Sequence, residues 1–265
     1  MNFRRAYAVF FRYTLLLWGN PQRLVQIFVW GSFDVILWGF LTKYLNGVGN
    51  AGFSFVPTLL GGIILSDFLS RVQQGTATPA LEDIWSSNLL NYFASPLKVS
   101  EYILGLISSA ILTTILAMTV MLSIATMFGF SILSYGLSLS LFVLILFLFG
   151  IALGIIAAAI VLRYGPSSEW FIWPMVYVLT PFVGVFYPIA VLPHWMRAIA
   201  AILPPSYVFE GMRGIVLGAP SSLPSILFGV ILSCVYVVLA GIFFRFIFRT
   251  VVRYGLLARY SAEGI

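Results

Sequence analysis

Charged residues are scarce in this sequence. Asp, Glu, Lys and Arg make up 8% of the 265 residues, whereas about a quarter is usual for a soluble domain. So few charges cannot cover a water-exposed surface, which excludes a soluble globular enzyme. The 17% share of aromatic residues excludes a disordered chain. The 61% share of hydrophobic residues therefore predicts an all-α polytopic membrane protein, and the length fits about six spans of roughly 20 residues each.

Cysteine and histidine are nearly absent. Cys234 is the only cysteine, which excludes an intrachain disulfide and a cysteine metal site. His194 is the only histidine, which excludes a multi-histidine metal centre. The net charge of +6 does not indicate a nucleic-acid partner, because the basic residues stand beside apolar runs. There they orient the chain in the membrane and meet anionic lipids.

The sequence also lacks the motifs of nucleotide-binding and hydrolytic sites. A P-loop needs a Gly-Lys pair, but the two lysines, Lys43 and Lys98, follow Thr42 and Leu97. Neither H-E-x-x-H nor G-x-S-x-G occurs. The S-x-x-K match at residues 95–98 lacks its companion motif, and we interpret it as a chance match. We therefore expect the chain to bind no cofactor of its own.

The first 20 residues predict an amphipathic helix in the membrane interface. Arg4 and Arg5 resemble the start of a signal peptide, but Arg12 interrupts the apolar core that should follow. Asn20-Pro21 predicts the end of the helix. The apolar stripe at helical spacing consists of Phe3, Tyr7, Phe10, Phe11, Thr14, Leu15 and Trp18.

Six apolar segments follow, within one expected transmembrane domain that covers residues 1–265. The predicted spans are residues 24–45, 53–70, 102–128, 135–162, 170–187 and 223–248. With the N-terminus inside, 11 basic residues, Arg71 among them, fall on the inner side, and Lys43, Arg197 and Arg213 fall on the outer side. This asymmetry predicts that both termini are cytoplasmic.

The longest polar connection, residues 71–101, is expected on the inner side. Pro79 and Pro96 suit the two boundaries of a short amphipathic helix in the region 79–96. Glu82 and Asp83 fall on its polar face. Its apolar residues at helical spacing are Leu81, Ile84, Trp85, Leu89, Tyr92 and Phe93. The periodicity leaves two interpretations open: a helix that docks a partner protein, and an interfacial helix without a partner.

The connection at residues 188–220 is apolar but is interrupted by five prolines. The stretches 194–203 and 207–217 are each too short to span a membrane. We predict a re-entrant helical hairpin that dips in from the outer side; the alternative is a surface loop with two interfacial helices.

Charged residues within the apolar segments suggest a few specific contacts. Asp34 lies in the middle of the first segment, where it would touch cargo, gate a path, or pair with a polar neighbour that holds helices together. Asp67 with Arg71, and Glu210 with Arg213, have the spacing of local ion pairs. Residues Gly150, Gly154 and Ala158 form a small-residue face that predicts close helix packing.

Taken together, the chain resembles the membrane-spanning permease subunits of type-2 ATP-binding-cassette (ABC-2) exporters. The resemblance covers essentially the whole chain and depends on three features: the amphipathic N-terminal helix, residues 89–97 followed by Glu101, and residues 187–213. The stretch 89–97 reads LLNYFASPL and is similar to the end of the family's cytoplasmic coupling helix. The block 187–195 reads YPIAVLPHW and is similar to the hairpin before the last span.

The resemblance implies a mechanism. Two permease copies, forming a homodimer in a bacterial inner membrane, pair with two separate ATPase subunits that hold ATP and Mg²⁺. The ATPases push on the coupling helix, and a hydrophobic or lipid-linked cargo passes outward between the permeases. The implied coupling residues are Leu81, Glu82, Asp83, Trp85, Leu89, Tyr92 and Phe93. The implied residues of the path or gate are Asp34, Tyr187, Glu210 and Arg213.

Two other classes of protein remain possible at this point. An intramembrane acyltransferase or protease would use Asp34, Glu210 or His194 as an acid or base, although the scarcity of titratable groups argues against this class. A passive channel or scaffold would work without ATP.

Overall fold

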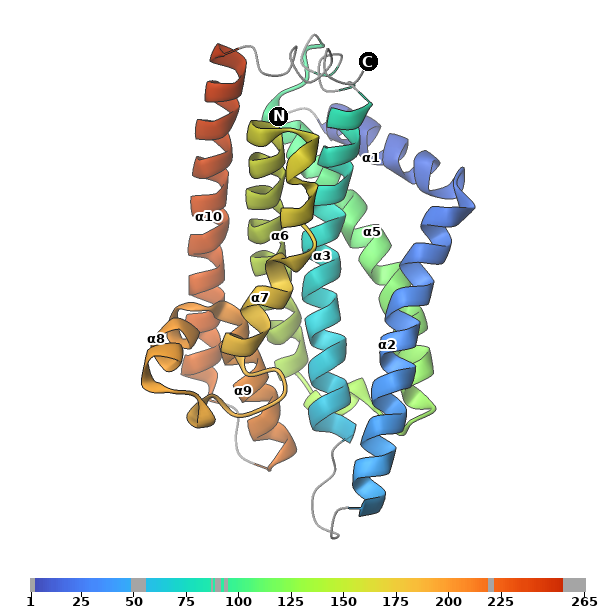
Figure 1. Ribbon diagram of the computed structural model, residues 1–265, viewed down its shortest axis with the longest axis vertical. Helices are drawn as coiled ribbons and strands as arrows, with labels where there is room; N and C mark the ends of the chain where they lie inside the picture. Colours follow the sequence, from blue (N-terminus) through green and yellow to red (C-terminus); the bar gives the residue numbers. More distant parts are fainter. Residues whose placement is uncertain are drawn as a thin grey trace.

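A computed structural model describes residues 3–48, 56–86, 88, 92, 95–218 and 222–254. Within these ranges all regular secondary structure is helical, in agreement with the all-α prediction. The helices form an elongated bundle (Figure 1). Helix α1 and the C-terminal end of α10 lie at one end of the bundle, and the short helices α8 and α9 lie towards the other (Figure 1).

The N-terminal helix α1 covers Phe3–Trp18 and packs on the protein through a narrow face. Ala6, Val9, Tyr13 and Leu17 are buried on this face. Val9 lies so close to Gly105 that a Cβ there would be 2.6 Å from its side chain. Phe3, Tyr7 and Trp18 of the predicted apolar stripe are exposed. An apolar stripe that faces outwards is typical of a helix lying in a membrane interface.

Two long helices follow. Helix α1 ends just before Asn20-Pro21, as predicted, and α2, Pro21–Val48, begins three residues before the expected start of the first span. A π-helical turn at Val56–Leu60 leads into α3, Gly61–Trp85. The expected helix start at Pro79 is wrong, because α3 runs through this proline without a break.

Helix α6 lies at the centre of the bundle. Helix α5, Val99–Thr126, is joined to α6, Ser138–Tyr164, by a 3-10 turn at Ile132–Tyr135. The predicted small-residue face of α6 packs on α3. A Cβ on Gly154 would lie 2.6 Å from Cβ of Thr76, and one on Gly150 would lie 2.9 Å from Cβ of Val72.

The fifth predicted span is not one continuous helix. A 3-10 helix at Pro166–Phe171 precedes α7, Pro174–Val183, which is only 10 residues long. Pro174 begins α7, and Gly184 ends it with a positive φ of 72°. A helix of this length is too short to cross a bilayer alone, so the prediction of an unbroken span over 170–187 is wrong.

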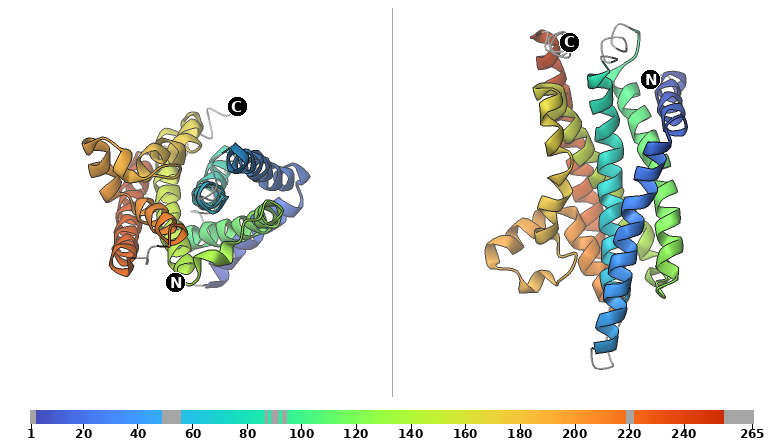
Figure 2. Two further views of the ribbon diagram at one scale, coloured as in Figure 1. Left: turned by 90° about the horizontal axis from the view of Figure 1, so that it is seen from below. Right: turned by 45° about the vertical axis from the view of Figure 1, so that its right-hand side comes forward.

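The connection at residues 188–220 contains the two short helices that its sequence predicts. A 3-10 turn at Ile189–Val191 leads to α8, His194–Ile202, and then to α9, Pro204–Val216. Helix α8 projects sideways from the bundle (Figure 2), whereas α9 packs against α6 and α10. The last helix, α10, covers Leu223–Arg253.

Four helices of the described ranges are long and apolar enough to cross a membrane: α2, α5, α6 and α10. They coincide with the first, third, fourth and sixth predicted spans. Helix α3 is 25 residues long but carries Asp67, Arg71, Glu82 and Asp83, which makes it more polar than the others. The chain is therefore an α-helical protein with several membrane-crossing helices.

Candidate functional site

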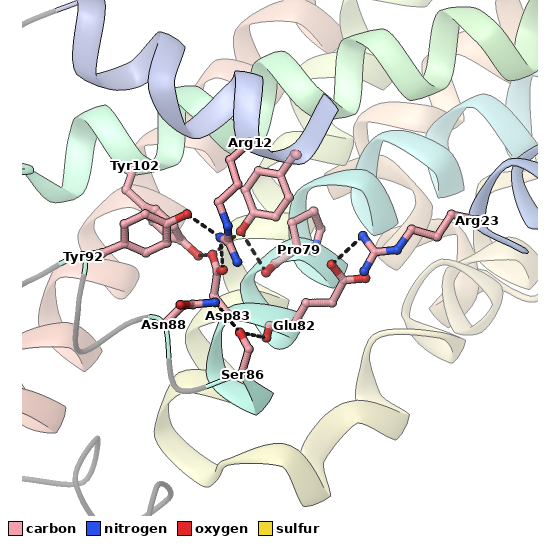
Figure 3. A network of polar contacts seen from close by, with 10 residues as sticks. Arg12, Arg23, Pro79, Glu82, Asp83, Ser86, Asn88, Tyr92 and Tyr102 are labelled. Carbon is pink, nitrogen blue, oxygen red and sulfur yellow. Dashed lines mark hydrogen bonds and ion pairs between the residues drawn. The ribbon is translucent and has the colours of Figure 1, made fainter. Parts of the chain in front are cut away.

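The carboxylate of Asp83 is the centre of a polar network where α1, α3 and α5 meet (Figure 3). Asp83 is completely buried. Its Oδ1 accepts a hydrogen bond of 2.5 Å from Arg12 Nη1 of α1. Its Oδ2 accepts one of 2.8 Å from the Tyr102 hydroxyl of α5 and a second from the Tyr13 hydroxyl of α1. One buried carboxylate thus joins three helices.

Arg12 and Tyr92 extend this network to the connection between α3 and α5. The Tyr92 hydroxyl accepts a hydrogen bond from Arg12 Nη1, and the guanidinium lies 5.3 Å from the centre of the Tyr92 ring. The Tyr92 and Tyr102 rings are 5.6 Å apart. A cation above an aromatic face is attracted by the ring, so Arg12 binds both the carboxylate and the aromatic pair beside it.

Burial and charge shift the protonation equilibria of this network. Partial burial opposes the charged form of Arg12, but the hydrogen bond and the charge of Asp83 outweigh it and raise the Arg12 pKa. Burial, reinforced by the negative charge of Asp83, raises the pKa of Tyr13 well above its ordinary value and also raises that of Tyr92. Arg12 therefore stays charged, Tyr13 stays protonated and donates to Asp83, and Tyr92 stays protonated while its hydroxyl accepts from Arg12.

Two further ion pairs flank Asp83. Arg23 at the start of α2 is 3.0 Å from Glu82. Arg5 donates to the carbonyl of Pro96 and lies 3.7 Å from the buried carboxylate of Glu101. The first 23 residues are thus attached to both ends of the connection between α3 and α5.

The structure corrects the amphipathic pattern expected for residues 81–93. Asp83, predicted on the polar face, is buried, and Trp85, predicted on the apolar face, is 53% exposed. Leu81 and Ile84 are buried as expected. The reason is that residues 81–85 continue α3, with Leu81, Asp83 and Ile84 facing the interior of the bundle, and a turn at Ser86 ends the helix. The predicted Leu89 and Phe93 lie outside the described residues.

A polar cavity of about 640 Å³ lies between α2, α3, α5 and α7. Three carboxylates and two guanidiniums line it, together with neutral polar groups and aromatic rings. The charged lining residues are Arg23, Asp34, Asp67, Arg71 and Glu82; the aromatic ones are Tyr13, Trp30, Trp173 and Tyr177. Such a lining inside a bundle of apolar helices indicates a space that holds water or a polar group.

Arg71 organises the middle of this cavity. It pairs with Asp67, as the i, i+4 spacing predicts, and Arg71 Nη1 donates to the Ile27 carbonyl over 2.9 Å. The guanidinium lies over Gly31 of α2, where a Cβ would collide with it. Asp34 stands one turn further along α2 and lines the same cavity, so the structure brings Asp34 and Arg71 to one space.

The other three residues predicted for the path, Tyr187, Glu210 and Arg213, lie in and next to the connection at residues 188–220. Arg213 pairs with Glu210 over 3.3 Å, as its spacing predicts, and Arg213 Nη2 donates to the Gly184 carbonyl over 2.8 Å. Glu210 accepts a hydrogen bond of 2.7 Å from the Ile189 amide. The Tyr187 hydroxyl donates to the Pro181 carbonyl. These contacts fasten residues 184–189 to α7 and α9, and the ring of Phe186 in this stretch stacks on Trp38 of α2, one turn beyond Asp34, at 5.1 Å.

Sequence reasoning missed three members of the Asp83 network: Arg12, Tyr13 and Tyr102. One signal was present for Arg12, because it interrupts an otherwise apolar run. Tyr13 and Tyr102 give no signal that separates them from the 11 other tyrosines of the 13 in the chain. Within the described ranges, no group of three or more His, Cys, Asp or Glu side chains is placed to hold a metal ion.

The network and the cavity can be compared with known families. Residues 5–217 match the family model described as ABC-2 type transporter. This stretch includes Arg12, Asp83, Asp34 and Arg213, and therefore both ends of the bundle. No curated protein matches the sequence.

Proposed function

Because the chain belongs to the ABC-2 type transporter family, a family of transport permeases, we propose that it is the permease subunit of an ABC exporter and that a separate ATPase subunit supplies the energy. ATP and Mg²⁺ would be held by that subunit. The observation that supports this role is the shared carboxylate of Asp83. A force applied to the connection between α3 and α5 reaches α1, α3 and α5 through one buried group.

The proposed coupling surface is the end of α3 with the stretch that follows it. Trp85 is a large apolar side chain that is exposed beside Ser86, at the end of α3 next to the buried Asp83. We assign three roles to the residues of the predicted coupling set, which are Leu81, Glu82, Asp83, Trp85, Leu89, Tyr92 and Phe93. Trp85 contacts the ATPase subunit, with Leu89 and Phe93 assigned to the same role. Asp83, Glu82 and Tyr92 transmit the movement inwards, and Leu81 packs in the core.

We propose six crossings, with both termini on the cytoplasmic side of a bacterial inner membrane. Four crossings are α2, α5, α6 and α10. Helix α3 is the second, because its 25 residues extend about 37 Å at 1.5 Å per residue. The fifth consists of the 3-10 helix at Pro166–Phe171 followed by α7. Helices α8 and α9 form the re-entrant hairpin, and α1 lies among membrane lipids at the inner interface.

The inner part of the translocation path is assigned to the cavity that contains Asp34. Asp34 is exposed on the single chain, and a charge at mid-membrane that faced lipid would cost about 2.5–3.5 kcal/mol or more. A second copy of the chain, placed over this face, would enclose the cavity and remove that cost. The cargo is a hydrophobic or lipid-linked compound, whose polar part occupies the cavity. Tyr187, Glu210 and Arg213 hold the outer gate.

The test uses the tagged chain purified from the membranes of its own host. The expected result is that an ATPase co-purifies with it, and that the chain stripped of this partner hydrolyses no nucleotide. Trp85→Asp should release the ATPase, whereas Trp170→Asp, at another exposed tryptophan outside the coupling stretch, should retain it. Nucleotide hydrolysis by the stripped chain, or full ATPase retention by Trp85→Asp, would overturn the proposal.

A further inference from the structure

A second cavity, of about 430 Å³, lies between α8, α9 and the start of α10. We propose that it binds a neutral amphiphile that carries hydroxyl groups, with its apolar part in the cavity. The site shares no lining residue with the cavity around Asp34. Of the residues assigned to the transport path, Glu210 alone lines it, and the proposed ligand site goes beyond the role given to that residue. The volume is within the usual range for small-molecule sites.

One face of α9 forms the floor of this outer cavity. Ser206, Glu210 and Gly214 are spaced at i, i+4 and i+8, which places them in a row along the helix, and all three line the cavity. Gly214 has no heavy atom within 4 Å of the position where a Cβ would stand. The row therefore offers two hydrogen-bonding groups followed by open space.

The Ser206 hydroxyl is the observation that points to a ligand. Its side chain is only 3% exposed, and Oγ has no hydrogen-bond partner among the described residues. A buried hydroxyl without a partner is unfavourable. A ligand hydroxyl in the cavity would satisfy it, because each of the two groups both donates and accepts a hydrogen bond.

The charges around the cavity favour a neutral ligand. Glu210 Oε1 accepts from the Ile189 amide and is balanced by Arg213, so its carboxylate attracts no free cation. The same carboxylate lies one turn from Ser206 and disfavours an anion there. Arg197 is held at the rim by the carbonyls of Leu192 and Ala190. A sugar-type hydroxyl suits this environment. It can donate a hydrogen bond to the Glu210 carboxylate, and it can donate to or accept from the Ser206 hydroxyl.

The rest of the lining is mostly apolar. Ile189, Ala200, Ala201, Gly211 and Ile226 leave room for a hydrocarbon chain. Tyr207, Ser222 and Ser225 also line the cavity; the Tyr207 hydroxyl donates to the Ala201 carbonyl, and the two serine hydroxyls hydrogen-bond to each other. An alkyl glycoside, with one hydrocarbon chain and a neutral hydroxyl-rich head, therefore represents the expected ligand class.

The test uses the full chain in lipid nanodiscs and an alkyl glucoside with a diazirine in its tail. Photolabelling followed by peptide mapping should place the label on residues 194–226. Gly214→Phe should abolish this label by filling the cavity. Gly241→Phe is the matched control, because a Cβ on Gly241 of α10 also meets open space, and labelling there should stay as in the wild type. Equal labelling of both variants would overturn the proposal.

The hydrogen bond to Ser206 and the preference for a neutral head group can be tested separately. Ser206→Ala should weaken glucoside binding about five-fold, as expected for one lost hydrogen bond. Competition on the unmodified chain needs no variant: octyl glucoside should displace the label, and octyl sulfate and octyltrimethylammonium should do so much less well. Displacement by either charged compound at lower concentration than octyl glucoside would overturn the assignment, and so would an unchanged affinity in Ser206→Ala.

Such an amphiphile has two sources, a resident glycolipid of the membrane and the transported cargo. Native mass spectrometry of the assembled transporter separates them. Bound cargo should leave when ATP is added, whereas a resident glycolipid should stay, and either result supports the site. An empty site in protein from host membranes, together with no labelling by the glucoside, would overturn it.

Discussion

Arg12 Nη1 donates a hydrogen bond to Asp83 Oδ1 over 2.5 Å and joins α1 to the end of α3 across 71 residues of sequence. The contact matters because Asp83 is completely buried, and a buried carboxylate without donors is strongly unfavourable. The position of α1 is thereby linked to that of α3. If one helix moved without the other, the Asp83 carboxylate would be exposed or would stay buried without its Arg12 partner.

The two hydroxyl donors to Asp83 should contribute measurably to stability. We expect Tyr13→Phe to lower the free energy of unfolding by about 1.5–3 kcal/mol, the usual contribution of a hydrogen bond to a charged group. Thermal unfolding in detergent measures it. Tyr7→Phe is the matched control, since Tyr7 lies on the same helix and is 60% exposed. Equal losses in the two variants would contradict the role of the Tyr13 hydroxyl.

Arg12 and Asp83 should be energetically coupled. Arg12→Gln alone leaves a buried carboxylate with fewer donors, whereas Arg12→Gln with Asp83→Asn removes the uncompensated charge as well. We expect the double variant to be more stable than the sum of the single losses predicts, by about 0.5–3 kcal/mol. Unfolding of the four proteins of this cycle gives the coupling energy. Strict additivity would show that the pair does not hold the helices together.

Close packing of α6 on α3 should tolerate no side chain at residue 154. Gly154→Leu places a Cβ that would stand 2.6 Å from Cβ of Thr76, so the helices must separate. We expect a loss of roughly 1–3 kcal/mol or more, seen as a lower yield of monodisperse protein and a lower unfolding temperature. Gly241→Leu should change neither, because its site on α10 is open.

Water should reach Asp34 but not its neighbour in the sequence. In a chain whose native Cys234 is replaced by serine, we expect Asp34→Cys to react with a charged, membrane-impermeant thiol reagent. Phe33→Cys should react far more slowly, because Phe33 is 62% exposed on the outer surface of α2 and does not line the cavity. The ratio of the two labelling rates is the measurement. Equal rates would contradict a water-filled path at Asp34.

Local patterns in the sequence were sufficient for several features. The ion pairs Asp67–Arg71 and Glu210–Arg213 both form, because residues three or four apart on a helix are neighbours in any fold. The close packing at Gly150 and Gly154 also follows from helical spacing. Asp34 was singled out correctly as a polar residue in an apolar helix, but its proximity to Arg71 depends on the packing of α2 on α3.

The errors share one physical cause. Pro79 was expected to start a helix because proline interrupts helical hydrogen bonding, yet the surrounding contacts keep α3 continuous to Trp85. Asp83 was expected on a polar face because the spacing of the neighbouring apolar residues, which is also a local pattern, places it there. Its burial depends on Arg12, Tyr13 and Tyr102, and no pattern within the segment reports donors that come from elsewhere in the chain.

The sequence by itself determined the all-helical membrane class, the N-terminal helix and four of the crossing helices, because apolar composition and helical periodicity are properties of neighbouring residues. Only the tertiary structure decided which charges are buried and which space they surround. Those outcomes depend on groups from distant helices meeting at one point, as Arg12 meets Asp83, and the free energy of a buried charge is set by the partners it finds there.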